Sequence, residues 1–500
     1  MKMLRIVRRL MLAGLAVCCV VSGHPTDAQT KAQTAAKKTT ASQPSPVTAL
    51  IMSDIHFDPF RDPGKAQRLL DAPEGEWNGI LNTPDSTDRA VTFAKVQKAC
   101  KARPAVMTEM LLQSSLAAMK QSAPDGKFAL VTGDLVVHDF DCRFKTVFPG
   151  KTEEEYGVFA AKTLRYVVAQ IRLTLAGTPV YVALGNNDSG CTDYFMDRGD
   201  PFLKATEGAM LDGLASSPAE KKTAKASYSL TGDISLKMKA PMQRTRLILL
   251  NDTFQSRKYE TCGHKPNPEA VSAQIVWLTK QLTSARRSKE KVWLVGHIPP
   301  GIDPYSTFSK FKNVCVGDQP VMFLSSERLA DVMGQYADVI QLGLFGHSHM
   351  DELRLFGTDG KGAKGKVPIK MIASVSPWDG NYPSFTVAKV DPAGSRLVDY
   401  DVIAASNLTG IGAVWTKEYS FGETFHKPDF SASTVNTLIT EFAADPGVRD
   451  PMSHAFLQHY FVGDQSMLLK SLWPQYVCTL SNHTVKGFAA CVCPAPGSPQ

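Results

Sequence analysis

The sequence predicts a layered α/β domain, followed by a smaller helical region that carries cysteines. Short apolar runs recur along the chain, as expected of strands that are buried on both faces of a sheet. Stretches with an apolar residue at every third or fourth position lie between them, as in amphipathic helices. Strands that alternate with such helices are typical of a layered α/β fold.

The first 46 residues are expected to precede the folded part. Four basic residues and an apolar run from Leu10 to Val21 are typical of an export signal, so we expect a signal peptide over residues 1–28. Residues 29–46 contain almost no bulky apolar side chain, which predicts a disordered linker. No later segment is long and apolar enough to predict a membrane span. We therefore expect the protein to be secreted or periplasmic.

The charge distribution gives no reason to expect binding to a nucleic-acid duplex. The formal net charge is +7, but residues 1–28 hold four basic residues and one aspartate, and residues 29–46 hold three lysines. The part of the chain from Val47 onward is therefore nearly neutral. A nearly neutral body lacks the basic footprint that a nucleic-acid-binding domain carries.

The predicted strands and helices divide the rest of the chain into two regions. Helical spacing is clearest over residues 164–175 and 271–282. The later apolar runs lack long helices between them and could form a second sheet. We place a boundary near Asn407, with the main domain over 47–405 and a helical subdomain over 406–500. The predicted strands lie at 47–52, 128–131, 180–184, 247–250, 292–295, 339–345, 369–373, 385–390 and 398–403.

Polar residues that can bind a metal ion follow five of these apolar runs. Asp and His side chains with one Asn provide oxygen and nitrogen ligands. The carboxyl ends of strands in an open α/β sheet share one edge, so we expect these side chains to converge. Unrelated turns and caps are the alternative, but five such motifs in order disfavour it. The residues are Asp54, His56, Asp134, Asn186, His297, His347 and His349.

The order Asp-x-His, Gly-Asp, Gly-Asn-x-Asp, Gly-His and Gly-His-x-His resembles the calcineurin-like metallophosphoesterase superfamily. The segments Gly296–Gly301 and Gly346–Glu352, and Ser376-Pro377 followed by Asn381, are similar to those of acid sphingomyelinase-like phosphodiesterases. The resemblance covers roughly Val47 to Cys493. It implies two mixed β-sheets flanked by helices, with a small C-terminal helical subdomain that carries cysteines.

The resemblance also implies a site for two divalent metal ions. Family precedent favours zinc, although iron or manganese would also suit these ligands. A metal-activated water would attack the phosphorus of a phosphoester. The resemblance assigns Asp54, His56, Asp134 and His349 to one ion, and Asp134, Asn186, His297 and His347 to the other, with Asp134 as the bridge. We expect the protein to be a monomer.

Eight cysteines lie after the predicted signal peptide, and an even number in an exported protein favours disulfides. The spacing leaves their pairing open. The resemblance implies one bridge, between Cys262 and Cys315. We expect the last three cysteines, Cys478, Cys491 and Cys493, to hold the C-terminal subdomain together.

One position departs from the family pattern. Many relatives have a histidine where this chain has Asn187, and the sequence Gly-Asn-Asn-Asp resembles that of endopolyphosphatases. An amide can donate a hydrogen bond to a phosphate oxygen, but it cannot deliver a proton. His138, four residues beyond Asp134, is then the candidate general acid, or else it supports a metal ligand. Asp188 is expected to orient the backbone or a ligand.

Three functions remain open at this point. The first is a phosphodiesterase that acts on a phospholipid head group or a nucleotide-like diester. The second is a phosphoanhydride hydrolase, which Asn187 favours because a polyphosphate leaving group hardly needs a proton. The third is an inactive binding protein, although every expected ligand is present. Basic residues could line a groove for an anionic substrate or form an ordinary solvated surface; they are Arg143, Lys145, Lys310 and Lys312.

Overall fold

The computed structural model describes residues 45–103, 105–214, 217–310, 312–357, 362–464 and 466–493. The predicted signal peptide and almost all of the predicted linker lie outside these residues. Across the described ranges, we find no helix with the length and apolar character needed to cross a bilayer.

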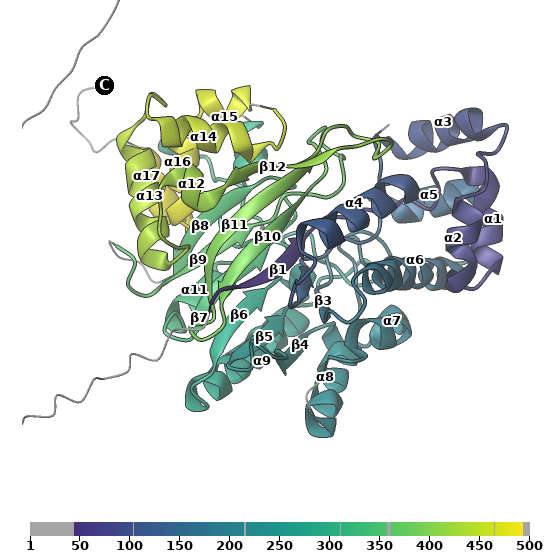
Figure 1. The fold of residues 1–500 in the computed structure, drawn as a ribbon, viewed down its shortest axis with the longest axis horizontal. Helices are drawn as coiled ribbons and strands as arrows, with labels where there is room; N and C mark the ends of the chain where they lie inside the picture. Colours follow the sequence, from purple (N-terminus) through teal and green to yellow (C-terminus); the bar gives the residue numbers. More distant parts are fainter. Residues whose placement is uncertain are drawn as a thin grey trace, which may run out of the picture. The chain divides into compact units, whose positions relative to one another are not determined.

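Two six-stranded mixed sheets form the centre of the fold (Figure 1). In each sheet, parallel strands carry antiparallel neighbours. The first has the order β12 (Trp415–Ser420), β11 (Arg396–Ala405), β10 (Ser384–Asp391), β1 (Val47–Met52), β2 (Ala129–Val131) and β3 (Val180–Val182). The second has the order β4 (Ile234–Lys237), β5 (Thr245–Leu249), β6 (Lys291–Val295), β7 (Ile340–Phe345), β9 (Lys366–Met371) and β8 (Glu352–Gly357).

The main hydrophobic core contains residues of both sheets, and a second core lies on the outer face of the second sheet. Successive side chains of a strand point to opposite faces, and β5 shows this directly. Leu247 and Leu249 belong to the main core, whereas Ile248 belongs to the second core with residues of α9 (Pro268–Arg287) and α11 (Arg328–Gln335). The second sheet is therefore buried on both faces.

Helices connect and cover the strands. The predicted helical stretches lie in α6 (Glu153–Thr174) and α9. A capping box between Thr152 and Glu155 begins α6. The other helices before α11 are α1 (Pro63–Asp71), α2 (Trp77–Leu81), α3 (Arg89–Cys100), α4 (Glu109–Ser122), α5 (Phe140–Val147), α7 (Pro201–Leu211), α8 (Pro218–Thr231) and α10 (Pro304–Phe308), with 3-10 turns η1 (Glu74–Glu76), η2 (Asp252–Gln255) and η3 (Val314–Val316).

The C-terminal helices gather around aromatic side chains. The rings of Phe442, Phe456, Trp473 and Tyr476 lie within contact of one another, and all four are buried. Strand β12, which lies beyond the predicted boundary at residue 405, pairs with β11 and extends the first sheet. The helices are α12 (Phe421–Phe425), α13 (Ala432–Ala444), α14 (Pro451–Tyr460), α15 (Met467–Ser471), α16 (Trp473–Ser481) and α17 (Val485–Val492).

All nine predicted strands are confirmed within a few residues, and three further strands were missed. The missed strand β8 contains Glu352 and Arg354, which are fully buried yet charged, so its sequence does not resemble a buried strand. The missed strand β12 is at the edge of its sheet and is mostly polar. Strand β4 is short and also lies at an edge.

The predicted disulfide between Cys262 and Cys315 is wrong. Cys262 is bonded to Cys191, because the loops after β3 and β5 lie together. Cys315 is bonded to Cys493, and this bond ties the end of α17 to η3. The described residues also contain the bonds Cys100–Cys142 and Cys478–Cys491.

Candidate metal centre

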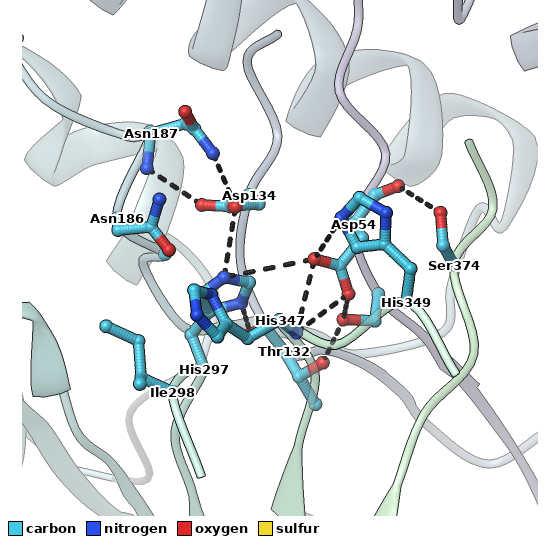
Figure 2. Close-up of polar contacts among 12 residues, drawn as sticks. Asp54, Thr132, Asp134, Asn186, Asn187, His297, Ile298, His347, His349 and Ser374 are labelled. Carbon is cyan, nitrogen blue, oxygen red and sulfur yellow. Dashed lines mark hydrogen bonds and ion pairs between the residues drawn. The ribbon is translucent and has the colours of Figure 1, made fainter. Parts of the chain in front are cut away.

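The seven predicted ligands come together where strands of both sheets end (Figure 2). The expectation of one shared sheet edge needs correction, because β1, β2 and β3 belong to the first sheet and β6 and β7 to the second. Six of the ligands are buried, and only His347 is partly exposed. The centre therefore lies between the sheets and opens to solvent on the side of His347.

Short distances join the ligand atoms on the Asp54 side of the centre. His56 Nε2 lies 3.6 Å from Asp54 Oδ1 and 3.0 Å from His349 Nε2. His349 Nε2 lies 3.4 Å from Asp54 Oδ1. Ligands bound at 2.0–2.1 Å to one tetrahedral ion lie about 3.3 Å apart, so this spacing suits a shared cation.

Asp134 lies between the two groups of ligands. Its Oδ2 is 3.7 Å from His56 Nε2 and 3.0 Å from His297 Nε2. His347 belongs to the same cluster as Asp134 and His297. Asn186 lies beside Asp134 and His297 in Figure 2, and its Oδ1 is buried without a partner among the described residues. The residues thus fit two divalent ions with Asp134 between them.

Backbone carbonyl groups fix two of the ligand rings, His56 and His297, from behind. His56 Nδ1 lies 3.1 Å from the carbonyl oxygen of Val136, and His297 Nδ1 lies 2.9 Å from that of Thr132. In metal sites such outer contacts select the tautomer whose other nitrogen faces the ion. The Nε2 atoms of both rings accordingly face the carboxylate of Asp134.

Two carboxylates support the remaining ligands. Asp379 Oδ2 lies 2.8 Å from His349 Nδ1. Asp193 Oδ1 accepts a hydrogen bond of 2.6 Å from Asn186 Nδ2, which leaves Asn186 Oδ1 turned toward the centre. These contacts orient one ligand of each predicted ion.

The backbone at the centre adopts the left-handed region at most ligand positions. Non-glycine residues rarely have positive φ, and such backbone strain gathers at functional sites. Two buried aspartates hold these turns. Asp188 accepts hydrogen bonds from the backbone N–H groups of Leu135, Val136 and Gly185, as expected of an orienting residue, and Asp252 accepts from those of His297 and Ile298. Positive φ occurs at Asp54, His56, Asp134, His347 and His349.

Glycines allow the strand ends to approach one another closely. A Cβ atom at Gly185 would lie 2.1 Å from Asp134 Oδ1, and one at Gly346 would lie 2.0 Å from Ser53 Oγ. Neither position could hold a larger residue without displacing a ligand or its partner. These two glycines are therefore required by the packing of the centre.

Nearby carboxylates raise the pKa values of two of the ligand histidines. Burial opposes protonation of His297, but Asp134 and Asp54 outweigh it and raise its pKa to about 10. Burial likewise opposes protonation of His349, and Asp54 and Asp379 raise its pKa to about 10. Buried carboxylates thus attract positive charge at this point, and a divalent cation would take the place of these protons.

Comparison with known proteins identifies relatives of this chain. No protein-family model matches it. A mouse acid sphingomyelinase-like phosphodiesterase 3b is 26% identical over 404 residues, which cover 76% of this chain and 79% of the relative. The human sphingomyelin phosphodiesterase is 24% identical over 339 residues, covering 64% of this chain and 47% of the relative. A human cyclic GMP-AMP phosphodiesterase is 26% identical over 264 residues, covering 49% and 53%.

The chain is a homologue of the acid sphingomyelinase-like phosphodiesterases. The prediction of a phosphoester hydrolase is thereby confirmed. Among solved structures, a dimetal phosphatase from Danio rerio aligns with a TM-score of 0.36 at 12% identity, covering 75% of this chain and all of that one.

Asn187, the departure from this family's pattern, contacts the central carboxylate. Its backbone N–H and its side-chain amide donate to the two oxygens of Asp134 at 2.8 and 2.6 Å. The side chain is buried, so its amide hydrogens are directed at Asp134 and not at open space. This contact restrains the carboxylate that the family pattern places between the ions.

His138 packs directly on His56, one of the predicted ligands. Its ring stacks on that of His56 with 4.0 Å between centroids, and Trp378 covers it at 4.6 Å. Its Nε2 is buried without a hydrogen-bond partner among the described residues. Burial lowers the pKa of His138 well below its ordinary value. Its role as general acid or as support for His56 stays a prediction.

A cavity of about 490 Å³ adjoins the centre, and His347 forms part of its wall. Aromatic and basic side chains line it, among them Tyr194, Tyr305, Phe323 and Lys258. Four basic residues were expected either to line a groove or to form a solvated surface, and for Arg143 neither holds. It is fully buried and paired with Asp58 at 2.8 Å.

Sequence reasoning missed the carboxylates behind the ligands. Asp252 follows the fourth predicted strand, which was the one early strand end left without a function, so a signal for it existed. Asp193 and Asp379 lie in loops with no periodic pattern. Their contacts with ligands depend on how distant segments fold together.

Proposed function

We propose that this protein is an exported phosphodiesterase whose activity depends on two divalent metal ions, zinc by family precedent, with iron or manganese as alternatives. The observation that carries the proposal is the convergence of the seven predicted ligands, with Asp54 and Asp134 among them at the centre. Its relatives are named phosphodiesterases. The four disulfides in the described residues support export to an oxidising compartment.

Each residue of the centre has a role in this proposal. Asp54, His56, Asp134 and His349 hold one ion, and Asp134, Asn186, His297 and His347 hold the other. When bound, such ions activate a water molecule and neutralise the charge that builds up on the phosphoryl oxygens. Asn187 fixes the orientation of Asp134. His138, beside His56, is the candidate donor of a proton to the leaving oxygen.

A second candidate function is the hydrolysis of phosphoanhydrides. The hydrogen bonds from Asn187 to Asp134 favour it, because they leave no proton donor at a position where many relatives have histidine. A phosphate leaving group needs little protonation, whereas an alkoxide needs a proton.

The test is a substrate panel with the purified protein. Bis-nitrophenyl phosphate, nitrophenyl phosphate, sphingomyelin, ATP and polyphosphate are assayed after dialysis against a chelator, with and without added zinc. We expect metal-dependent cleavage of the diester, loss of this cleavage in Asp134→Asn, and retention in Asp125→Asn, a change at an exposed turn. Activity that survives chelation, or in Asp134→Asn, would refute the proposal.

A further inference from the structure

The cavity beside His347 contains three cations, and carboxylates neutralise two of them. Arg103 contacts Asp379, and Arg257 lies 3.6 Å from Asp303. Lys258 is the third. Within the described ranges, no carboxylate lies within ion-pair distance of its Nζ. Its charge is therefore the uncompensated one in the cavity.

The position of Lys258 is tied to the metal centre through one aromatic ring. Its Nζ lies 4.2 Å from the ring centroid of Tyr194, a cation–π contact. The ring of Tyr194 meets that of His347 edge to face with 6.2 Å between centroids. The backbone N–H of Tyr194 donates to the carbonyl oxygen of Asn186 at 2.9 Å. Lys258 thus contacts Tyr194, and Tyr194 in turn contacts His347 and Asn186, two predicted ligands of the same ion.

The two loops that carry Tyr194 and Lys258 are joined to each other. The disulfide Cys191–Cys262 links them, and the backbone N–H of Met196 donates to the carbonyl oxygen of Glu260 at 3.1 Å. The backbone that carries Lys258 is therefore held in place by the neighbouring loop, whereas the Lys258 side chain reaches solvent.

Partial burial is the main influence on the pKa of Lys258. Burial, together with Arg257 and Lys310, lowers its pKa, while Asp193 and Asp303 oppose this. An anion bound beside Lys258 would favour its charged form and offset the cost of this burial.

We propose that Lys258, held on Tyr194, binds a second phosphate group of the substrate, next to the phosphate that occupies the metal centre. The substrate class is an oligophosphate, either inorganic or carried by a nucleoside. This inference rests on the second candidate function, the hydrolysis of phosphoanhydrides, and names its substrate class. In the reaction, a water oxygen bonds to phosphorus, and the anhydride P–O bond breaks. The second phosphate leaves with the electron pair, and the proton of the water passes to solvent.

The arrangement around Asn187 agrees with this substrate class. Its amide is directed at Asp134, so it serves orientation and cannot protonate a leaving group. A leaving phosphate is stable as an anion and would instead be held by the ammonium of Lys258.

The experiment compares Lys258→Gln with Lys120→Gln, a change of an exposed lysine on α4. KM and kcat are measured for tripolyphosphate, ATP and bis-nitrophenyl phosphate, and bound zinc is measured for each variant. In Lys258→Gln we expect KM for both oligophosphates to rise roughly tenfold, the loss typical of one charge-assisted contact. KM for the diester and the zinc content should stay unchanged. Lys258→Arg should restore most of the loss.

Tripolyphosphate and ATP distinguish an inorganic from a nucleoside oligophosphate as the substrate. A rise in KM for ATP alone would assign the Lys258 contact to nucleoside phosphates. An unchanged KM for both oligophosphates in Lys258→Gln, or an equal rise for the diester, overturns the proposal. Wild-type protein that cleaves the diester but neither oligophosphate also overturns it, while the proposed phosphodiesterase function stands. Wild-type protein that cleaves no phosphoester refutes both.

Discussion

The contact between Asp379 and His349 predicts how metal binding changes when the Asp379 carboxylate is replaced by an uncharged amide. Asp379 Oδ2 lies 2.8 Å from His349 Nδ1, and Arg103 contacts the same carboxylate and donates to the carbonyl oxygen of Trp378 at 2.9 Å. Asp379→Asn keeps the shape of the side chain but removes its charge. The imidazole then loses the partner that orients it and raises its basicity.

The size of the effect follows from the role of the contact. Loss of a carboxylate behind a metal-binding histidine typically weakens metal affinity by roughly 10–100-fold. His349 belongs to the ion that is also held by Asp54 and His56, so we expect Asp379→Asn to lose that ion first. The bound metal should fall from two ions toward one per chain at limiting free zinc. Excess zinc should restore activity.

The chain offers a matched control for this substitution. His459 Nδ1 lies 3.0 Å from Glu418 Oε1, which is the same kind of contact at a place outside the centre. Zinc affinity is measured by competition with a chromophoric chelator for the wild type, Asp379→Asn and Glu418→Gln. Wild-type affinity in Asp379→Asn, or equal weakening in Glu418→Gln, would refute the reasoning.

Three further predictions follow from the geometry. Asp193→Asn should lower the affinity for the other ion roughly 10-fold or more. Metal titration of this variant beside Asp379→Asn should show that the two variants lose metal from different sites. Gly346→Ala should abolish metal binding, because its methyl group would lie 2.0 Å from Ser53 Oγ, whereas Gly75→Ala has free space and should leave zinc content unchanged. Burial raises the pKa of Asp233 to about 7, so the folded state binds a proton that the unfolded state releases near pH 4. Stability should therefore fall as the pH rises toward 7, by about 1.4 kcal/mol per unit at most, and Asp233→Asn should flatten this slope in chemical denaturation at pH 5, 6 and 7.

Local pattern was sufficient to predict the strands and the ligands that follow them. Each motif lies within a few residues of an apolar run, so the identity of Asp54, Asp134 and His297 as candidates needed no knowledge of distant contacts. The glycine before a motif was also a local signal, since the structure leaves no room for a side chain at Gly185.

Features that depend on tertiary contacts could not be predicted in the same way. The motifs end strands of two different sheets, and nothing in their spacing shows this. Cys262 pairs with Cys191 because β3 and β5 bring their following loops together. Arg143 looked like a surface cation, yet it is buried against Asp58. The support of His349 by Asp379 likewise joins segments that have no common pattern.

The most direct test of the shared-carboxylate centre is elemental analysis of the purified, active protein and of Asp134→Asn. We expect about two divalent ions per wild-type chain and the loss of both in the variant, since Asp134 lies between both groups of ligands. Active protein without bound metal, or an Asp134→Asn variant that keeps two ions, would contradict the account.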